Sequence, residues 1–281
     1  MIYNLKVTMT VDLDVIIDSP DYSVEMRSGL KTLQGSSDAV RTISETVLAG
    51  KIPERKTFKG KVRTVLKSSF SGSYGQIFTL DIFDEKLKTK YGEIGWEVFS
   101  EILSYFLNES VYKETRGVGI AAKKIIEDLG EIGEELSKHL RASAMKNIHD
   151  TSFKFNYDVK IRIRKNREEQ KVLAKFDRVT GATLATKLDP QNIDILAAIT
   201  RLNINTGNGR LELLEDNETT AFGFGAEYKL VNLNAKQTLS DNLASNNLLE
   251  KEQRIYIKLQ VRALRILDGK VVKYFISGFY E

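Results

Sequence analysis

The C-terminal third of the chain contains two runs of alternating apolar and polar residues, and each run reverses at a tight turn. The first reverses over Asn205–Gly209, where glycine and asparagine tolerate the positive φ angles of a sharp turn. The second alternates over 255–263, slips by one residue near Leu264 as at a β-bulge, and turns at Asp268-Gly269. Both runs are therefore predicted to form β-hairpins.

A further strand and a helix are expected between the hairpins. Thr219–Phe224 alternates like a strand, and Ala235–Leu249 has apolar residues at roughly helical spacing. Gly223 and Gly225 would mark a bulge or a tight bend in this strand. Five or so strands with one helix are typical of a small SH3-like or OB-like β-barrel.

The N-terminal half shows one long strand pattern followed by helical patterns. Apolar residues alternate with mostly polar ones from Tyr3 to Ile17, which predicts a strand or strand pair with one buried face. An antiparallel strand pair is expected over 58–67 and 74–83. Helices are expected from Ser19-Pro20 to Gly50, over 91–112 and over 117–148. The predicted fold class is α+β, with an N-terminal antiparallel sheet with packed helices and a C-terminal small β-barrel.

The domain boundary is expected near Ala144–Ser152. This boundary gives an α+β domain with long amphipathic helices over 1–150 and a small β-barrel domain over 151–281. The alternation over Phe153–Ile163 predicts a strand at the start of the second domain. The segment Asn166–Val179 fits a helix and a strand equally well.

Composition excludes several classes of protein. The 281 residues include no cysteine, which excludes disulfides, thiolate zinc sites, iron–sulfur clusters and cysteine nucleophiles. The chain starts in a strand pattern without a signal segment, and no run approaches the ~18 apolar residues that span a bilayer. We expect a cytoplasmic protein without membrane contact and without a cofactor. A net charge of +4 permits contact with nucleic acid without requiring it.

The first C-terminal hairpin carries one resemblance. Ile199–Asn203 followed by Gly207–Leu211 is weakly similar to the opening hairpin of cold-shock domains, which place aromatic residues after the glycines to stack nucleobases. In this chain the matching positions hold Asn208, Arg210 and Glu212.

A second resemblance extends over more of the chain. It is carried by Asn203–Gly207, Gly209-Arg210, Phe222, Asp268–Val271 and Lys273–Ile276. With these residues the chain resembles an uncharacterised bacterial two-domain family, in which an N-terminal α+β domain precedes a barrel of this kind. The resemblance implies a fold and no particular activity.

Two basic clusters are candidates for phosphate or nucleic-acid binding. Lys160, Arg162 and Arg164 would project from one face of a strand about 6.6 Å apart, which can match a phosphate backbone. A solvated strand face is the alternative interpretation. The candidate residues are Lys160, Arg162, Arg164, Lys165 and Arg167 in one cluster, and Lys59, Lys61 and Arg63 in the other.

Other patterns suggest chemistry less directly. Asp158 with Glu169 and Lys171 resembles the acid and acid-x-lysine set that holds Mg²⁺ in restriction-type nucleases, and Asp84-Glu85-Lys86 offers a second acid-x-lysine pair. The glycines of 117–119 mimic a dinucleotide-binding loop, but they follow a predicted helix rather than a strand. His139 and His149 are ten residues apart, a spacing that does not align them on one helical face for metal binding, so no metal site is predicted.

The helix over 117–148 carries a short heptad-like seam formed by Ile125, Leu129, Ile132 and Leu136. The seam would either pack inside its own domain or join two subunits as a homo-oligomer. We therefore expect a non-catalytic binding or scaffold protein, an oligomeric subunit that contacts nucleic acid or a partner protein. The second resemblance suggests a bacterial defence or mobile-element system. A metal-dependent nuclease and a purely structural protein–protein interaction module are the alternatives.

Overall fold

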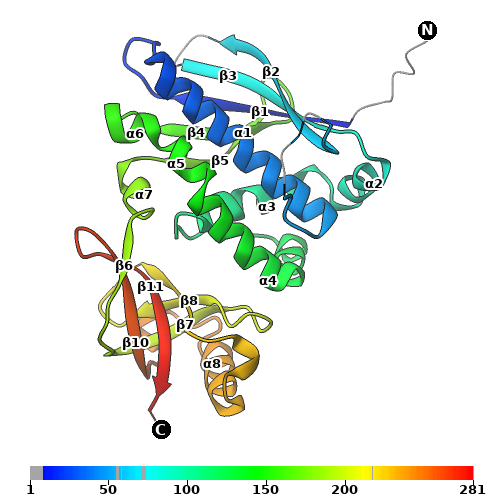
Figure 1. The fold of residues 1–281 in the computed structure, drawn as a ribbon. Helices are drawn as coiled ribbons and strands as arrows, with labels where there is room; N and C mark the ends of the chain where they lie inside the picture. The colour runs from blue at the N-terminus through cyan, green and yellow to red at the C-terminus, as the bar shows by residue number, and fades with distance from the viewer. Residues whose placement is uncertain (1–8, 55–56, 58, 71–73, 217, 281) are drawn as a thin grey trace. The chain divides into compact units, whose positions relative to one another are not determined.

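The computed structural model describes residues 9–54, 57, 59–70, 74–216 and 218–280. The chain divides into two compact units, Met1–Leu184 and Ala185–Glu281, each with its own sheet and hydrophobic core (Figure 1). The predicted boundary at residue 150 is wrong, because 151–184 supplies two strands to the N-terminal sheet. Within the described ranges, no helix combines the length and apolar character needed to cross a bilayer.

The N-terminal unit is built on a five-stranded antiparallel sheet with the order β2-β3-β1-β4-β5. Its strands are β1 (Met9–Ile17), β2 (Val62–Phe70), β3 (Tyr74–Ile82), β4 (Val159–Arg164) and β5 (Gln170–Phe176). The strand predicted from the N-terminal alternation is confirmed over β1, and its residues 3–8 lie outside the described part of the chain. β1 is central because it pairs with β3 on one side and β4 on the other.

The helices of this unit pack against one face of the sheet (Figure 1). They are α1 (Met26–Ala49), α2 (Glu85–Ile94), α3 (Trp96–Glu109), α4 (Ile120–Ala142), α5 (Ala144–Ile148), α6 (Asp150–Phe155) and α7 (Arg178–Ala182). Leu13 and Val15 of β1 lie in the same buried cluster as Val40 and Ile43 of α1. The apolar residues that alternate along β1 therefore lie on the face of the sheet that the helices cover.

Several helix ends differ from the prediction for local reasons. α1 begins at Met26 and not at Ser19-Pro20, because the Glu25 carboxylate accepts two backbone N–H bonds of the first turn. The helix expected over 91–112 divides at Gly95, which has a φ of 77° and separates α2 from α3. The next helix is kinked at Gly130, where φ is 50° and ψ is −125°.

The strand predicted over Phe153–Ile163 is only half correct. Its first residues form α6, which ends at Asn156 in the left-handed conformation, and the strand β4 starts at Val159. The ambiguous segment over 166–179 is resolved as the strand β5 and the start of α7.

The C-terminal unit is a closed barrel of five strands. They are β7 (Ile193–Leu202), β8 (Gly209–Leu213), β9 (Thr219–Phe224), β10 (Ile257–Ile266) and β11 (Val271–Phe279). The order is β11-β9-β8-β7-β10, and β10 pairs with β11 to close the barrel. The short strand β6 (Thr186–Leu188) adds to β10 outside the ring.

The strand order decides between the two predicted barrel types. β9 and β11 are parallel neighbours, and α8 (Leu233–Ser245) lies in the chain between β9 and β10. A ring in which the third and fifth strands are parallel and a helix precedes the fourth strand is OB-like. The predicted turn at Asp268-Gly269 is confirmed, and the pairing of β10 with β11 shifts register after Leu264, where a bulge was expected.

Candidate functional site

The three cations predicted on β4 do lie on one face of the strand, but each contacts an acid. Arg162 donates from Nε and Nη2 to the two carboxylate oxygens of Asp14, at 2.7 and 2.8 Å. Arg164 donates from Nη1 to the same carboxylate at 2.5 Å. The Lys160 ammonium lies 2.6 Å from the Asp18 carboxylate. Asp14 is fully buried beneath the two guanidinium groups.

Asp14 lies on β1, the neighbouring strand, and Asp18 follows the end of that strand. The register places Asp14 opposite Arg162 and Asp12 opposite Arg164. Asp14 contacts both Arg162, which is opposite it, and Arg164, and the pair with Arg162 joins β1 to β4 across 148 positions of sequence. This geometry favours a role in holding the sheet together over phosphate binding by Lys160, Arg162 and Arg164. The signal was present in the sequence, because Asp12 and Asp14 alternate along β1 as the cations alternate along β4.

The remaining predicted basic residues are dispersed. In the loop between β4 and β5, Lys165 pairs with Glu169 at 3.2 Å and Arg167 is exposed. In the other cluster, Lys61 lies 3.2 Å from Asp84. The Arg63 guanidinium lies over the Phe83 ring at 3.7 Å from its centroid, and Lys59 is exposed at the turn before β2. The sequence neighbours 55 and 56 lie outside the described residues.

The acids and lysine of the nuclease alternative are not brought together. Asp158 precedes β4 and Glu169 precedes β5, so the antiparallel pairing puts them at opposite ends of the hairpin. Seven strand residues separate these ends, which corresponds to roughly 20 Å. Asp158 pairs instead with Lys175 at 2.7 Å. The described residues contain no group of three or more metal-ligating side chains arranged to hold an ion.

The other acid-x-lysine pair and the glycine loop have structural roles. Asp84 caps α2 by accepting the Leu87 N–H at 3.2 Å. The Gly119 N–H, at the start of α4, donates to the Glu101 carboxylate at 2.8 Å. Glu101 thereby occupies the helix terminus at which a dinucleotide phosphate would bind.

The predicted oligomer seam packs inside its own unit. Leu136 is fully buried, and Ile125 and Leu129 pack against the N-terminal core. Ile132 is partly buried, and the kink at Gly130 interrupts the heptad spacing. A helix from a second subunit could contact only the exposed edges of these four side chains. The geometry therefore favours packing of α4 within its own unit over a helix-to-helix contact between subunits.

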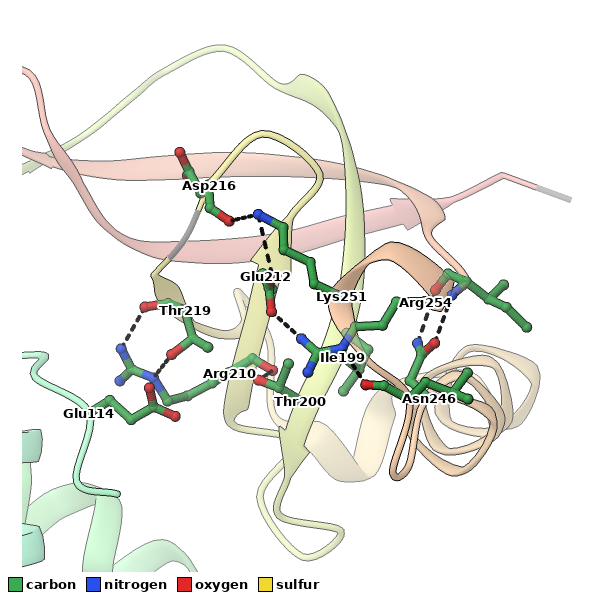
Figure 2. Close-up of polar contacts among 12 residues, drawn as sticks. Glu114, Ile199, Thr200, Arg210, Glu212, Asp216, Thr219, Asn246, Lys251 and Arg254 are labelled. Carbon is green, nitrogen blue, oxygen red and sulfur yellow. Dashed lines mark hydrogen bonds and ion pairs between the residues drawn. The ribbon is translucent and has the colours of Figure 1, made fainter. Parts of the chain in front are cut away.

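On the outer face of the barrel, the side chains of β8 are held by neighbouring segments (Figure 2). Arg210 donates from Nε and Nη2 to the hydroxyl and carbonyl oxygens of Thr219, at 2.7 and 2.8 Å. Glu212 pairs with Arg254 and, at 3.6 Å, with Lys251. Two of the three positions at which cold-shock domains carry stacking aromatics are therefore occupied by polar side chains with partners of their own.

The segment between α8 and β10 is held in place by two asparagines. Asn246 accepts the Ile255 N–H at 2.7 Å and donates to the Ile255 carbonyl at 2.9 Å (Figure 2). Asn242 accepts the Ile199 N–H of β7 at 2.8 Å. These side chains substitute for a strand neighbour. They satisfy the N–H of the buried Ile199 and both backbone groups of Ile255.

A different part of the barrel surface carries an aromatic ring between two cations. Phe275 of β11 lies opposite Gly223 of β9 on one side and opposite Arg262 of β10 on the other. Its strand neighbours Tyr274 and Ile276 are buried in the barrel core, so Phe275 points outward, where it is partly exposed. Lys273 precedes it on the same face, with its ammonium 5.4 Å from the ring centroid.

Two glycines make room for the cations. A Cβ atom on Gly223 would lie 3.2 Å from the Lys273 Nζ atom, and one on Gly225 would lie 3.9 Å from an Arg262 guanidinium nitrogen. The Lys273 ammonium donates to the Asn208 side-chain oxygen at 2.8 Å, which fixes its position. We call Lys273, Phe275 and Arg262 the cation–aromatic row. The strand order that assembles it could not be read from the sequence, which suggested only a bulge or bend at the two glycines.

Comparison with known proteins found no matching family model, no matching curated protein and no matching solved structure. The likeness to an uncharacterised bacterial two-domain family therefore stays a prediction. A role in a defence or mobile-element system stays one as well.

Proposed function

We propose that this chain is a non-catalytic binding protein whose C-terminal barrel contacts nucleic acid through the outer face of β9, β11 and β10. The observation that carries this proposal is the cation–aromatic row. Lys273 and Arg262 come from two different strands and flank the outward Phe275 ring, and their side chains lie over Gly223 and Gly225 of β9. Cations that track a backbone beside an aromatic ring are the common elements of nucleic-acid grooves.

The charge must act locally rather than through the whole unit. Residues 185–281 contain twelve Lys and Arg and twelve Asp and Glu, so the barrel has no net charge to attract a polyanion. In the described part of the chain Arg262 has no acid within ion-pair distance, and Lys273 is held by a neutral amide oxygen. We propose that both side chains contact phosphates on this face.

The number of cations sets a measurable salt dependence. Each phosphate contact on a single strand contributes about −0.7 to the slope of log K against log salt. Two contacts predict a slope of about −1.4, well below the value expected of a strongly basic protein. A steep slope would assign binding to cations elsewhere on the chain.

The test is a fluorescence-anisotropy titration of the full chain with a labelled 15-nucleotide oligomer at several salt concentrations. The double variant Arg262→Gln with Lys273→Gln should weaken binding at least tenfold and remove most of the salt slope. The matched control is Lys165→Gln with Arg167→Gln, two exposed cations of the N-terminal unit, which should leave affinity unchanged. Failure of the wild type to bind at low salt, or equal loss in both double variants, would refute the proposal and favour a protein partner.

A further inference from the structure

We propose that the open edge of the N-terminal sheet binds an extended peptide in which apolar and acidic residues alternate. The peptide would add to β2 as a further strand, beside the N-terminal half of α1. This surface belongs to the N-terminal unit, whereas the proposed nucleic-acid contact belongs to the barrel. The inference is therefore independent of the proposed function.

The strand β2 lies at the edge of its sheet. Among the described strands it pairs only with β3. An edge strand presents a row of backbone N–H and C=O groups to which another extended chain can bind. The pairing with β3 shifts register after Leu66, so the regular part of this edge covers 62–66. At about 3.3 Å per residue this part is roughly 16 Å long, enough for a short peptide.

The helix α1 lies alongside β2 and contacts it at known positions. The Ser37 hydroxyl lies 2.5 Å from the Thr64 hydroxyl. One turn further along the helix, Arg41 donates from Nη2 to the Thr57 carbonyl at 3.0 Å. Residue numbers rise along α1 while those of its contacts fall from 64 to 57, so the helix runs antiparallel to the strand.

Towards its N-terminus the same side of α1 carries apolar side chains that are exposed. Leu30 precedes Ser37 by seven residues, which puts it on the same stripe of the helix and about 10.5 Å away. That distance corresponds to about three strand residues, so Leu30 is level with the region of Leu66. Leu66 lies on the helix-covered face, because its partner on β3 is the buried Phe78. Nevertheless Leu66 is 64% exposed, Leu30 59% and Met26 77%.

An added strand would cover these side chains. Successive side chains of a strand point to opposite faces of the sheet, so every second residue of the peptide would lie on the helix side, next to Leu30 and Leu66. Apolar residues at these positions would remove apolar surface of both partners from water. The intervening residues would point to the opposite face of the sheet, which the helices do not cover.

The charges at this edge favour acidic residues at the intervening positions. Lys67 follows Leu66 and is exposed, and Arg27 is exposed three residues before Leu30. Within the described ranges neither side chain has an ion-pair or hydrogen-bond partner. Glu25, close to Arg27 in the chain, uses its carboxylate to cap α1. A lysine on an open edge discourages pairing with apolar or basic chains, and an acidic peptide would neutralise it.

A second copy of this chain suits the edge less well. Pairing of β2 with the same strand of another copy would bring Lys67 from both copies into one interface. Like charges across paired strands are destabilising. The charge that selects an acidic peptide therefore also opposes self-association through this edge.

The test is a fluorescence-anisotropy titration of the full chain with three labelled nine-residue peptides. One alternates valine and glutamate, one alternates valine and lysine, and the third is the first with prolines at its two central positions. The valine–glutamate peptide should bind about tenfold more tightly than either other peptide, because lysines would meet Lys67 and Arg27 and prolines cannot donate to β2. Hydrogen exchange in the complex should slow in β2 and stay unchanged in β5, the other edge strand of this sheet.

Variants locate the binding surface. Leu30→Ser with Leu66→Ser should weaken binding of the valine–glutamate peptide about tenfold, and Lys67→Glu should reduce its advantage over the valine–lysine peptide. The matched control is Leu248→Ser with Leu267→Ser, two exposed leucines of the other unit, which should change nothing. Lys67 is exposed, so its variant keeps the test valid if the first double variant fails to fold.

Three results would overturn the proposal. The first is the absence of saturable binding by the valine–glutamate peptide. The second is equal binding by the proline-containing peptide, which would exclude strand addition. The third is dimerisation of the wild type that Leu30→Ser with Leu66→Ser abolishes, measured as mass by light scattering, which would assign this surface to a second copy of the chain.

Discussion

The Arg162 guanidinium and the Asp14 carboxylate form a bidentate ion pair between residues 148 positions apart, and Asp14 is fully buried. Removal of a buried partner leaves an unpaired charge, which costs more than the pair contributes. Asp14→Ala is expected to lower the free energy of unfolding by about 3–5 kcal/mol, measured by urea denaturation. Asp12→Ala, at an exposed position of the same strand, should change it by less than about 0.5 kcal/mol. Equal effects would show that the pair is not what holds β1 to β4.

Gly35 lies where α1 crosses α5 at close range. A Cβ atom at this position would lie 2.6 Å from the Ile148 backbone nitrogen and 2.7 Å from the Ala144 carbonyl oxygen. Gly35→Ala should destabilise by about 1–3 kcal/mol or more, because backbone atoms cannot move aside as a side chain can. Gly92→Ala in α2 meets no atom within 4 Å and should stabilise by up to about 1 kcal/mol through helix propensity. Thermal unfolding of both variants tests this contrast in sign.

His149 is buried between α5 and α7, where its ring nitrogens contact the Met145 carbonyl at 2.7 Å and the Thr180 hydroxyl at 3.0 Å. Burial lowers its pKa below the ordinary value of about 6.5. The unfolded chain therefore binds a proton more readily. The stability contribution is full above about pH 6.5 and is lost as the pH falls through the pKa of the folded state.

Denaturation midpoints between pH 5 and pH 8 test this prediction for His149. The wild type should lose stability below about pH 6.5, and His149→Gln should show a smaller loss over the same range. The comparison with the variant is needed because burial raises the pKa of Glu45, which acts in the opposite direction. An unchanged slope in the variant would assign the pH dependence to other groups.

Asn246 holds the chain that enters β10 by two bonds to the backbone of Ile255. Asn246→Ala leaves the partly buried Ile255 N–H without its acceptor and should cost about 1–2 kcal/mol. Its neighbour Asn247 is exposed, and Asn247→Ala should have an effect within about 0.5 kcal/mol. Hydrogen exchange at Ile255 should accelerate only in the first variant. Unchanged protection there would mean that another group satisfies this amide.

The barrel could be predicted because its signals are local. The turn over Asn205–Gly209 and the turn at Asp268-Gly269 each fix a hairpin from neighbouring residues, and the α+β class with a small barrel is confirmed. The domain boundary could not be predicted in this way. β4 and β5 follow the expected boundary, but their partner is β1, and no local pattern reports a pairing over such a distance.

The same limit applies to the surfaces. The alternation of Lys160, Arg162 and Arg164 indicates one face of a strand, but their acids lie on a distant strand or directly after it. The row around Phe275 depends on the parallel pairing of β9 with β11, which places Gly223 beside it. The order of strands in a sheet depends on residues that are far apart in the sequence. Sequence patterns therefore predicted the strands, but not which side chains neighbouring strands place side by side.

The central position of β1 has a consequence for synthesis on the ribosome. The strand that covers its second edge begins 142 residues after β1 ends, which corresponds to roughly 10–30 s of translation. During this interval the edge is open to pairing with other nascent chains. Asp12 and Asp14 then stand on that edge as negative charges, before Arg162 and Arg164 are available to Asp14, and charge on an open edge discourages aggregation. Asp14, which later joins β1 to β4, would therefore also act earlier, by keeping other chains from pairing with the open edge.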